Sequence, residues 1–147
     1  MSTDESDVRI AQRLARGVCR ALTALGYGAL TEFPLNNGRR VDIIAVSGGG
    51  DIVIVEIKSS TADFRSDKKW TEYLDYCDAF YFAVAADFPI ALLPEDCGLI
   101  VADDYGAEIL RQAPARSLNG SRRRAQTLRL AVAAMQRLAR FLDPDPV

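Results

Sequence analysis

The chain has 147 residues and a formal net charge of −2, and 49% of its residues are hydrophobic and 26% charged. These values are typical of a globular chain, and we expect a single domain over residues 1–147. No apolar run approaches the roughly 20 residues that a membrane helix needs. The chain has no histidine, which excludes Ser-His-Asp and Cys-His catalysis and histidine-ligated zinc.

Cys19, Cys77 and Cys97 stand far apart, with no CxxC pair. Such scattered cysteines indicate reduced core thiols rather than a disulfide framework or a zinc site. The N-terminal segment MSTDESD is acidic and polar, which is the wrong composition for a signal or transit peptide. We therefore expect a cytoplasmic protein without membrane association.

The charge is unevenly distributed along the chain. Residues 1–110 carry 10 Lys and Arg against 18 Asp and Glu, whereas residues 111–147 carry eight Arg against two Asp. The sequence thus predicts an acidic body with a basic C-terminal element.

A helix is predicted near residues 5–25, where apolar residues recur at helical spacing before Gly26 and Gly28. Two turn sequences, Asn36-Asn37-Gly38 and Ser47–Gly50, then separate three predicted strands in an antiparallel meander. These strands lie at about 29–35, 40–47 and 51–58.

The second half of the chain begins with a polar segment, 59–66. It continues with a short helix near 67–77, a buried strand at 79–86, and shorter strands near 98–103 and 106–112. A basic helix at about 120–142 follows, and Pro144 cannot continue it. The order α-β-β-β-α-β predicts an α/β fold with a central mixed sheet flanked by helices.

Charged residues interrupt two of the apolar strands. Ile54, Glu56 and Lys58 share one face of their strand because strand side chains alternate. Asp42 lies about as far before the intervening turn as Glu56 lies after it, so the two carboxylates are expected to be about 5 Å apart. Carboxylates this close repel each other unless a cation or a shared proton lies between them.

Oxygen ligands without histidine or cysteine favour Mg²⁺ or Mn²⁺. A lysine beside such a site can stabilise negative charge on a phosphate. The pattern therefore indicates metal-assisted phosphodiester hydrolysis by Asp42, Glu56 and Lys58. The alternative is a chance Glu-x-Lys pair at a solvated strand end, and the residues alone leave both interpretations open.

Asp42 followed by Glu56-x-Lys58, in this helix and strand order, resembles the PD-(D/E)XK nuclease superfamily, with Val41-Asp42 at the "PD" position. The chain also resembles the MmcB-type DNA-repair family over roughly residues 25–112, and more loosely in the terminal helices. This second resemblance rests on NNGRRVDIIAV, VEIKSSTADFRSDKKWTEYLDYCDAFYFAV and DFPIALLPEDCGLIVADDYGAEIL.

The resemblance implies a restriction-endonuclease-like fold and Mg²⁺-dependent (or Mn²⁺-dependent) cleavage of DNA in the bacterial response to DNA damage. Asp42 and Glu56 would ligate the metal together with the backbone carbonyl of Ile57, and Lys58 would position the attacking water. Glu32 would supply an additional acidic ligand, or it is an exposed strand residue. The implied partners are DNA and translesion-repair proteins.

Several basic residues are candidates for DNA phosphate contacts: Lys68, Lys69, Arg122, Arg123 and Arg124. Trp70 either stacks on an unpaired base or packs in the core. Arginines also follow one face of each long helix, where they form a solvated face, contact phosphate or bind an acidic partner.

Two rival functions remain open. The first is a catalytically silent module that keeps the nuclease shape and binds DNA or recruits a translesion partner. The second is an oligomerisation domain, forming a homodimer, in which Asp42 and Lys58 make a buried ion pair.

Overall fold

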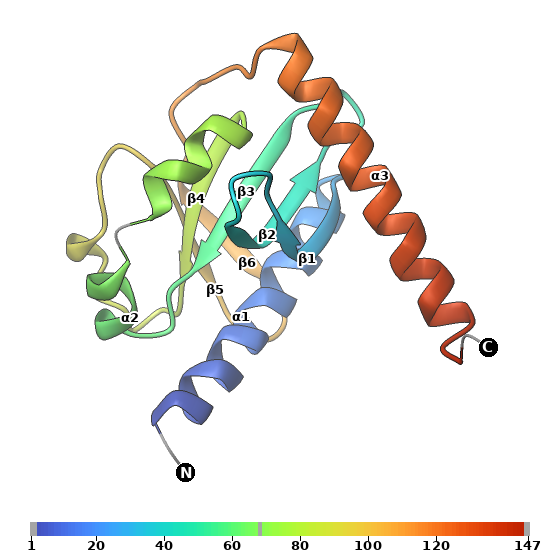
Figure 1. The fold of residues 1–147 in the computed structure, drawn as a ribbon. Helices are drawn as coiled ribbons and strands as arrows, with labels where there is room; N and C mark the ends of the chain where they lie inside the picture. The colour runs from blue at the N-terminus through green and yellow to red at the C-terminus, as the bar shows by residue number, and fades with distance from the viewer. Residues whose placement is uncertain (1–2, 68, 146–147) are drawn as a thin grey trace.

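The structure is a computed structural model that describes residues 3–67 and 69–145. It is an α/β fold in the predicted α-β-β-β-α-β order, followed by two more strands and a helix (Figure 1). The elements are α1 (Thr3–Ala24), β1 (Gly28–Pro34), β2 (Arg40–Val46), β3 (Ile52–Ile57), α2 (Thr61–Ser66), the 3-10 helix η1 (Trp70–Tyr76), β4 (Ala79–Val84), the 3-10 helix η2 (Ile90–Leu92), β5 (Gly98–Ala102), β6 (Ala107–Arg111) and α3 (Gly120–Leu142).

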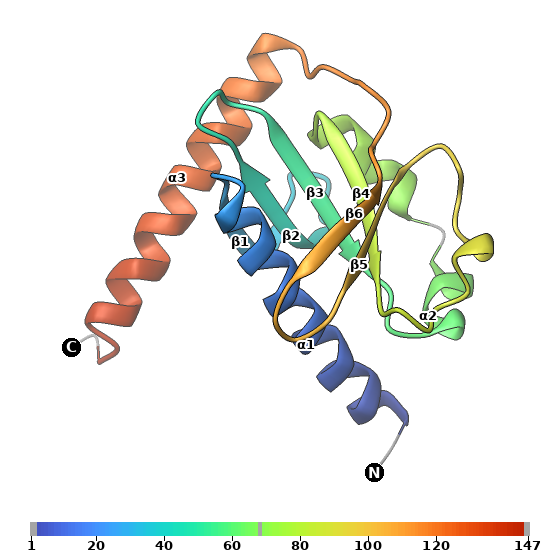
Figure 2. The ribbon, with the colours of Figure 1, turned by 180° about the vertical axis from the view of Figure 1, so that it is seen from behind.

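The six strands form a mixed sheet in the order β1-β2-β3-β4-β5-β6. The first three strands are antiparallel, as the short turns between them predict, and β3, β4 and β5 run parallel before β6 returns antiparallel. Helix α1 lies on one side of the sheet, as the view from behind shows, and η1 and α3 lie on the other (Figures 1 and 2). The predicted mixed sheet flanked by helices is therefore confirmed.

Helix α1 packs its apolar face on the sheet. Leu14, Val18 and Leu22 are buried in one cluster with residues of β2 to β5. Gly17 lets the helix approach the turn between β5 and β6, because a Cβ atom there would lie 1.9 Å from the carbonyl oxygen of Asp103. Burial of these side chains, at about 2 kcal/mol each, holds α1 against the sheet.

The opposite face of the sheet carries an aromatic cluster. Trp70 of η1 stacks on Phe80 with ring centroids 5.7 Å apart and meets the ring of Phe82 at 5.5 Å. Tyr73 packs on the same Phe80 ring. Trp70 is therefore a packing residue, as one of the two sequence interpretations holds.

The segment after β3 is more ordered than its polar composition predicts. Its first part is helix α2, because the Ser60 side chain caps the helix and accepts a hydrogen bond from the backbone N–H of Asp63 (3.0 Å). The helix predicted near 67–77 is a 3-10 helix at Trp70–Tyr76. Among the helices of the described residues, none is both long and apolar enough to cross a membrane.

Candidate active site at the open end of the β2–β3 pair

The strands β2 and β3 pair over only part of their length. Their ladder runs from Val46 opposite Ile52 to Ile43 opposite Val55. Beyond that point β2 continues its pairing with β1, and β3 continues its pairing with β4. The sheet therefore opens between the two strands at the next position, where the register places Asp42 level with Glu56.

The two carboxylates occupy this opening and replace the missing ladder bonds. Asp42 Oδ2 accepts a hydrogen bond from the backbone N–H of Ile57 (2.8 Å), and Glu56 Oε1 accepts one from the backbone N–H of Asp42 (2.9 Å). Each carboxylate thus uses one oxygen to hold the opposite strand. The second oxygen of each side chain accepts no hydrogen bond from a backbone N–H.

Burial sets the charge state of this pair. Burial, followed by the negative charge of Asp42, raises the pKa of Glu56 to about 9. Burial also raises the pKa of Asp42, although the Ile57 N–H, the Lys58 charge and a hydrogen bond with the Glu56 side chain oppose the rise. The raised pKa values of Asp42 and Glu56 favour a proton on the carboxyl pair near neutral pH, which is an alternative to a bound cation.

Lys58 lies beside the carboxylates but pairs with other acids. Its side chain is 6% exposed, and its Nζ atom lies 2.6 Å from Asp67 Oδ2 and 3.7 Å from Asp63 Oδ1. Burial alone would lower the pKa of Lys58, but the hydrogen bond to Asp67 and the surrounding carboxylates raise it. Lys58 is therefore a fixed ammonium group that cannot act as a general base near neutral pH.

A cleft of about 640 Å³ reaches the open end of the strand pair from the α1 side. Asp42 and Ile57 line its floor, Glu32 lines it from β1, and Arg16 of α1 adds a positive charge. Glu56 is buried behind this lining, with 6% of the residue exposed. Asp42 is therefore the member of the predicted trio that faces the cleft.

Glu32 lies on the same cleft but in an unusual backbone conformation. Its φ angle is 50°, in the left-handed region that residues other than glycine rarely adopt. It falls between the pairs Thr31 with Ile43 and Phe33 with Val41, at the position opposite Asp42. Its side chain is 69% exposed and lies 3.9 Å from Arg40.

The donor set suits a hard divalent cation with few protein ligands. Two adjacent carboxylates, Asp42 and Glu56, and a backbone carbonyl at Ile57 match the one or two carboxylates plus waters that Mg²⁺ usually takes. Within residues 3–67 and 69–145, no group of three or more acidic or thiol side chains converges on one point. Glu32 is a neighbour of the carboxylate pair on the cleft lining, and its role as a further ligand stays a prediction.

The predicted DNA-contact residues fall into different environments. Lys68 lies outside the described residues. Lys69 is exposed, and Arg124 is exposed on the first turn of α3. Arg122 is also exposed, but its guanidinium lies over the ring of Tyr76 and donates to the carbonyl of Asp75 (2.9 Å).

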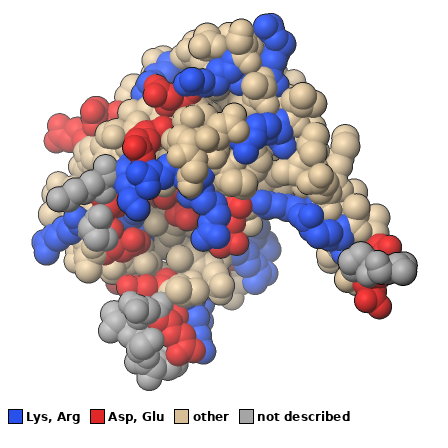
Figure 3. All heavy atoms as spheres, in the orientation of Figure 1, with Lys and Arg blue, Asp and Glu red and all other residues tan. Residues whose placement is uncertain are grey.

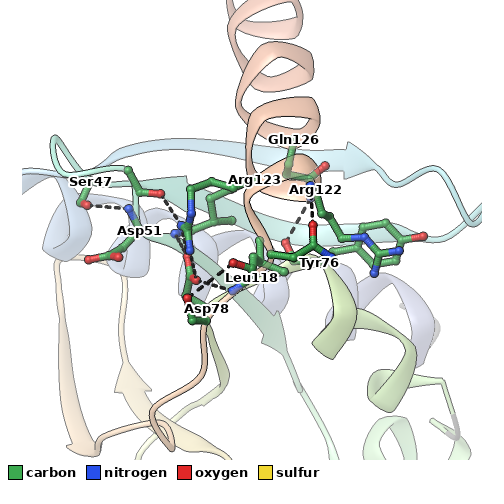
Figure 4. A network of polar contacts seen from close by, with 12 residues as sticks. Ser47, Asp51, Tyr76, Asp78, Leu118, Arg122, Arg123 and Gln126 are labelled. Atoms are coloured by element: carbon green, nitrogen blue, oxygen red, sulfur yellow. Dashed lines mark hydrogen bonds and ion pairs between the residues drawn. The ribbon is translucent and has the colours of Figure 1, made fainter.

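Arg123 is held inside the fold. Its guanidinium makes two hydrogen bonds of 2.6 Å to the buried carboxylate of Asp78 and a third to the carbonyl of Gly50 (Figure 4). Asp78 also accepts from the backbone N–H groups of Ile52 and Leu118. Burial opposes ionisation of Asp78, but these four donors hold its pKa at about 2. The sequence pattern missed Asp78, because no motif marks it.

Two further arginines of α3, Arg129 and Arg137, contact the body of the protein. Arg137 donates to the backbone carbonyls of Thr31 (2.6 Å) and Glu32 (3.1 Å), and Arg129 donates to the carbonyl of Pro34 (2.8 Å). Because β1 is an edge strand, these contacts cover backbone acceptors that no other strand pairs with. Arg129 and Arg137 therefore do not form a solvated face.

Most of the α1 arginines are also engaged. Arg13 pairs with Asp104 (3.7 Å), and Arg20 donates to the carbonyl of Tyr105 (2.8 Å). In the orientation of Figure 3, basic and acidic side chains are interspersed over the body instead of forming one basic patch. Arg16 therefore remains as the α1 arginine best placed for an anion in the cleft.

The fold and the paired carboxylates define an α/β protein with an acidic site at the open end of two strands. The model of the family described as "DNA repair protein MmcB-like" matches residues 2–145, and the chain belongs to this family. This confirms the family resemblance seen in the sequence and indicates a role in DNA repair.

The structure is similar to that of SPO1766, a protein of unknown function from Silicibacter pomeroyi. The two chains are 45% identical, with a TM-score of 0.89, and the match covers 91% of this chain and 92% of that chain. No curated protein matches the chain.

Proposed function

We propose that the protein hydrolyses DNA phosphodiester bonds with the help of Mg²⁺ or Mn²⁺. The observation that supports this function best is the meeting of Asp42 and Glu56 at the open end of the β2–β3 pair, beside the ammonium group of Lys58. Buried carboxylates side by side destabilise a fold unless they share a proton or bind a cation, and ionisable groups with such perturbed pKa values cluster at functional sites.

Each residue has a distinct role in this proposal. Asp42 and Glu56 would hold the ion through the oxygens that do not bind backbone N–H groups, together with the carbonyl of Ile57. When bound, the ion polarises the phosphate and lowers the pKa of a water molecule. Lys58 stabilises the negative charge that grows on the phosphate, because Asp67 and Asp63 fix its ammonium group beside the carboxylates.

Arg16 adds a positive charge at the cleft wall, where a DNA phosphate approaching Asp42 would pass. Lys69, Arg122 and Arg124 remain proposed DNA contacts on the side of η1 and α3. For Arg123 such a contact would require breaking its pair with Asp78.

A second candidate function is a silent nuclease-fold module that binds DNA or recruits a translesion-repair protein. One observation favours it: the charge of Lys58 is already neutralised by Asp67 and Asp63, and no third acidic side chain of the described part of the chain joins the pair. Such a module would use the cleft and the basic residues without cleaving DNA.

The two functions are separated by Asp42→Asn, which keeps an oxygen acceptor for the Ile57 N–H but removes the charge. Labelled single-stranded, duplex, flap and branched DNA are incubated with wild-type protein and Mg²⁺ or Mn²⁺, and Mn²⁺ binding is measured by calorimetry. Glu108→Gln serves as the matched control, because Glu108 is an exposed acid on β6, outside the cleft lining.

A nuclease cleaves at least one substrate only with metal, and Asp42→Asn loses both cleavage and Mn²⁺ binding while Glu108→Gln keeps both. A wild-type protein that binds DNA but neither cleaves it nor binds Mn²⁺ contradicts the nuclease proposal and supports the silent module. Arg16→Glu weakens DNA binding under either function.

A further inference from the structure

Helix α3 turns its polar face inward and its apolar face outward. The inward face carries three residues spaced seven apart: Arg123, Leu130 and Arg137. Leu130 is buried against the body, and both arginines donate to backbone carbonyls of the body. The C-terminal half of the helix extends past β1 as an arm (Figures 1 and 2). The inward face of α3 therefore contacts the body, and the outward face is exposed.

A continuous apolar stripe occupies the uncovered side. Leu128 is 66% exposed and Met135 69%. The stripe comprises Leu128, Val132, Met135, Leu138 and Leu142, all exposed. The line along the centre of the stripe runs through Leu128, Val132, Met135, Ala139 and Leu142, with Leu138 beside it. These positions are four, three, four and three residues apart, which is the a and d pattern of a two-helix coiled coil.

We propose that this stripe binds the same stripe of a second copy of the chain, with the two α3 helices antiparallel. The bodies would then lie on the outer sides of the helix pair, because the inward face of each α3 is opposite the stripe. The inference does not depend on the proposed nuclease function.

The distribution of charge along α3 favours an antiparallel arrangement of identical helices. The first turn carries Arg122 and Arg124, and the only acids of residues 120–145 are Asp143 and Asp145 at the other end. Acidic side chains are visible at the free end of the arm in Figure 3. A parallel pair would bring the arginines of the two helix starts together, whereas an antiparallel pair brings them to the end that carries Asp143 and Asp145 beside Arg140.

The register that aligns the stripe also aligns these ends. Val132 then faces Met135 of the second copy, and Leu128 faces Ala139. In the same register Arg124 lies beside the segment after the end of the second copy's helix, which carries Asp143 and Asp145. Flanking ion pairs of this kind set partner choice and orientation in coiled coils.

The contact area of the stripe alone is smaller than that of a stable dimer interface and has the size of a weak, transient contact. At roughly 90 Å² for each exposed apolar side chain, the five of the stripe bury about 450 Å² per copy and about 900 Å² in total. Specific interfaces bury upwards of about 1,000 Å², and side chains bordering the stripe add to the area. We therefore expect a dissociation constant in the micromolar range.

Other occupants suit the stripe less well. A DNA backbone binds cations, whereas this face presents leucine, valine and methionine. An anionic lipid surface needs basic side chains along the apolar face, but Arg129 and Arg137 are bound to carbonyls of β1, so the exposed arginines Arg124 and Arg140 lie only near the two ends of the helix.

Sedimentation velocity on the whole protein tests the proposal between about 1 µM and about 1 mM, a range that spans the expected affinity. Wild-type protein is expected to shift from monomer to dimer. Leu128→Glu with Met135→Glu is expected to stay monomeric throughout, with unchanged circular dichroism. Phe141→Glu is the matched control, because Phe141 is 82% exposed on the same helix but lies off the stripe; it is expected to dimerise like the wild type.

Exchanging charges at the two ends of the helix tests the antiparallel register. This test remains valid even if the Leu128→Glu, Met135→Glu variant does not fold. Arg124→Glu alone and Asp145→Arg alone are each expected to weaken dimerisation by about tenfold at low salt, and the double variant is expected to restore it. A wild-type protein that stays monomeric over the whole range overturns the proposal. A dimer that persists in the Leu128→Glu, Met135→Glu variant also overturns it. The same holds if the wild-type protein stays monomeric but binds anionic vesicles, and the stripe variant loses that binding.

Discussion

Asp78→Asn is expected to lower the stability of the protein more than any other removal of a single carboxylate. The Asp78 side chain receives four hydrogen bonds, two of them from the guanidinium of Arg123. It joins the start of β3, the start of β4 and the base of α3 (Figure 4). An amide at this position leaves the Arg123 charge without a counterion.

Two routes give a similar magnitude. Asp78 has its pKa lowered from 3.8 to about 2, and at about 1.4 kcal/mol per unit this corresponds to roughly 2 kcal/mol. Breaking a buried ion pair by removing one partner costs about 3 kcal/mol or more. For a chain of this length, a loss of 2–3 kcal/mol lowers Tm by roughly 5–10 °C.

Thermal denaturation followed by circular dichroism measures this loss as a function of pH. Because the pKa of Asp78 is lowered on folding, its contribution is present above about pH 4 and is lost as the pH falls toward 2. The deficit of the variant is therefore largest at neutral pH and shrinks in acid. Asp75→Asn, which removes an exposed carboxylate three residues earlier, is expected to change Tm little.

A double-mutant cycle with Arg123→Met assigns the loss to the pair. The double variant is expected to be more stable than the sum of the single losses predicts. If Asp78→Asn lowers Tm equally at neutral and acid pH, or if the losses of the two single variants simply add, the ion pair does not carry the stabilisation assigned to it.

Three further predictions concern the carboxylate pair, its lysine and the packing of α1. Glu56→Gln is expected to raise Tm of the metal-free protein by several degrees at pH 8 and little at pH 5: the pKa of Glu56 is raised from 4.5 to about 9, so the folded state loses stability as the pH rises through that interval. If the protein is the proposed nuclease, Lys58→Met is expected to slow DNA cleavage by about 100-fold while Mn²⁺ binding persists in calorimetry, because in that proposal Lys58 stabilises charge and is not a ligand. Gly17→Ala is expected to lower the free energy of unfolding by about 1–3 kcal/mol in urea denaturation, because its Cβ would meet the Asp103 carbonyl oxygen at 1.9 Å.

The position of the carboxylate pair could be predicted from the sequence. Strand alternation and the length of the turn before β3 place Asp42 level with Glu56, and the ladder of β2 and β3 has that register. The partners of Lys58 could not be predicted, because Asp67 comes from the loop after α2 and reaches back by a path that no periodicity describes. The same holds for Asp78, whose donors come from three separate segments.

The orientation of α3 also could not be predicted from its sequence. An amphipathic pattern shows that one face is apolar and the other basic, but it does not show which of them meets the body. Here the unpaired carbonyls of β1 accept hydrogen bonds from Arg129 and Arg137, so the basic face is turned inward. The orientation of α3 is set by the edge strand β1, and β1 can be recognised as an edge strand only when the order of the strands is known.

The covering of β1 by arginines of α3 has a consequence for folding during synthesis. Arg137 reaches the carbonyl of Thr31 across 106 positions of the chain. While the ribosome is still making α3, the meander of β1, β2 and β3 is complete but its outer edge is bare, and bare edges recruit strands from other chains. Truncated or stalled products that lack α3 should therefore aggregate, even though they contain every strand of the sheet.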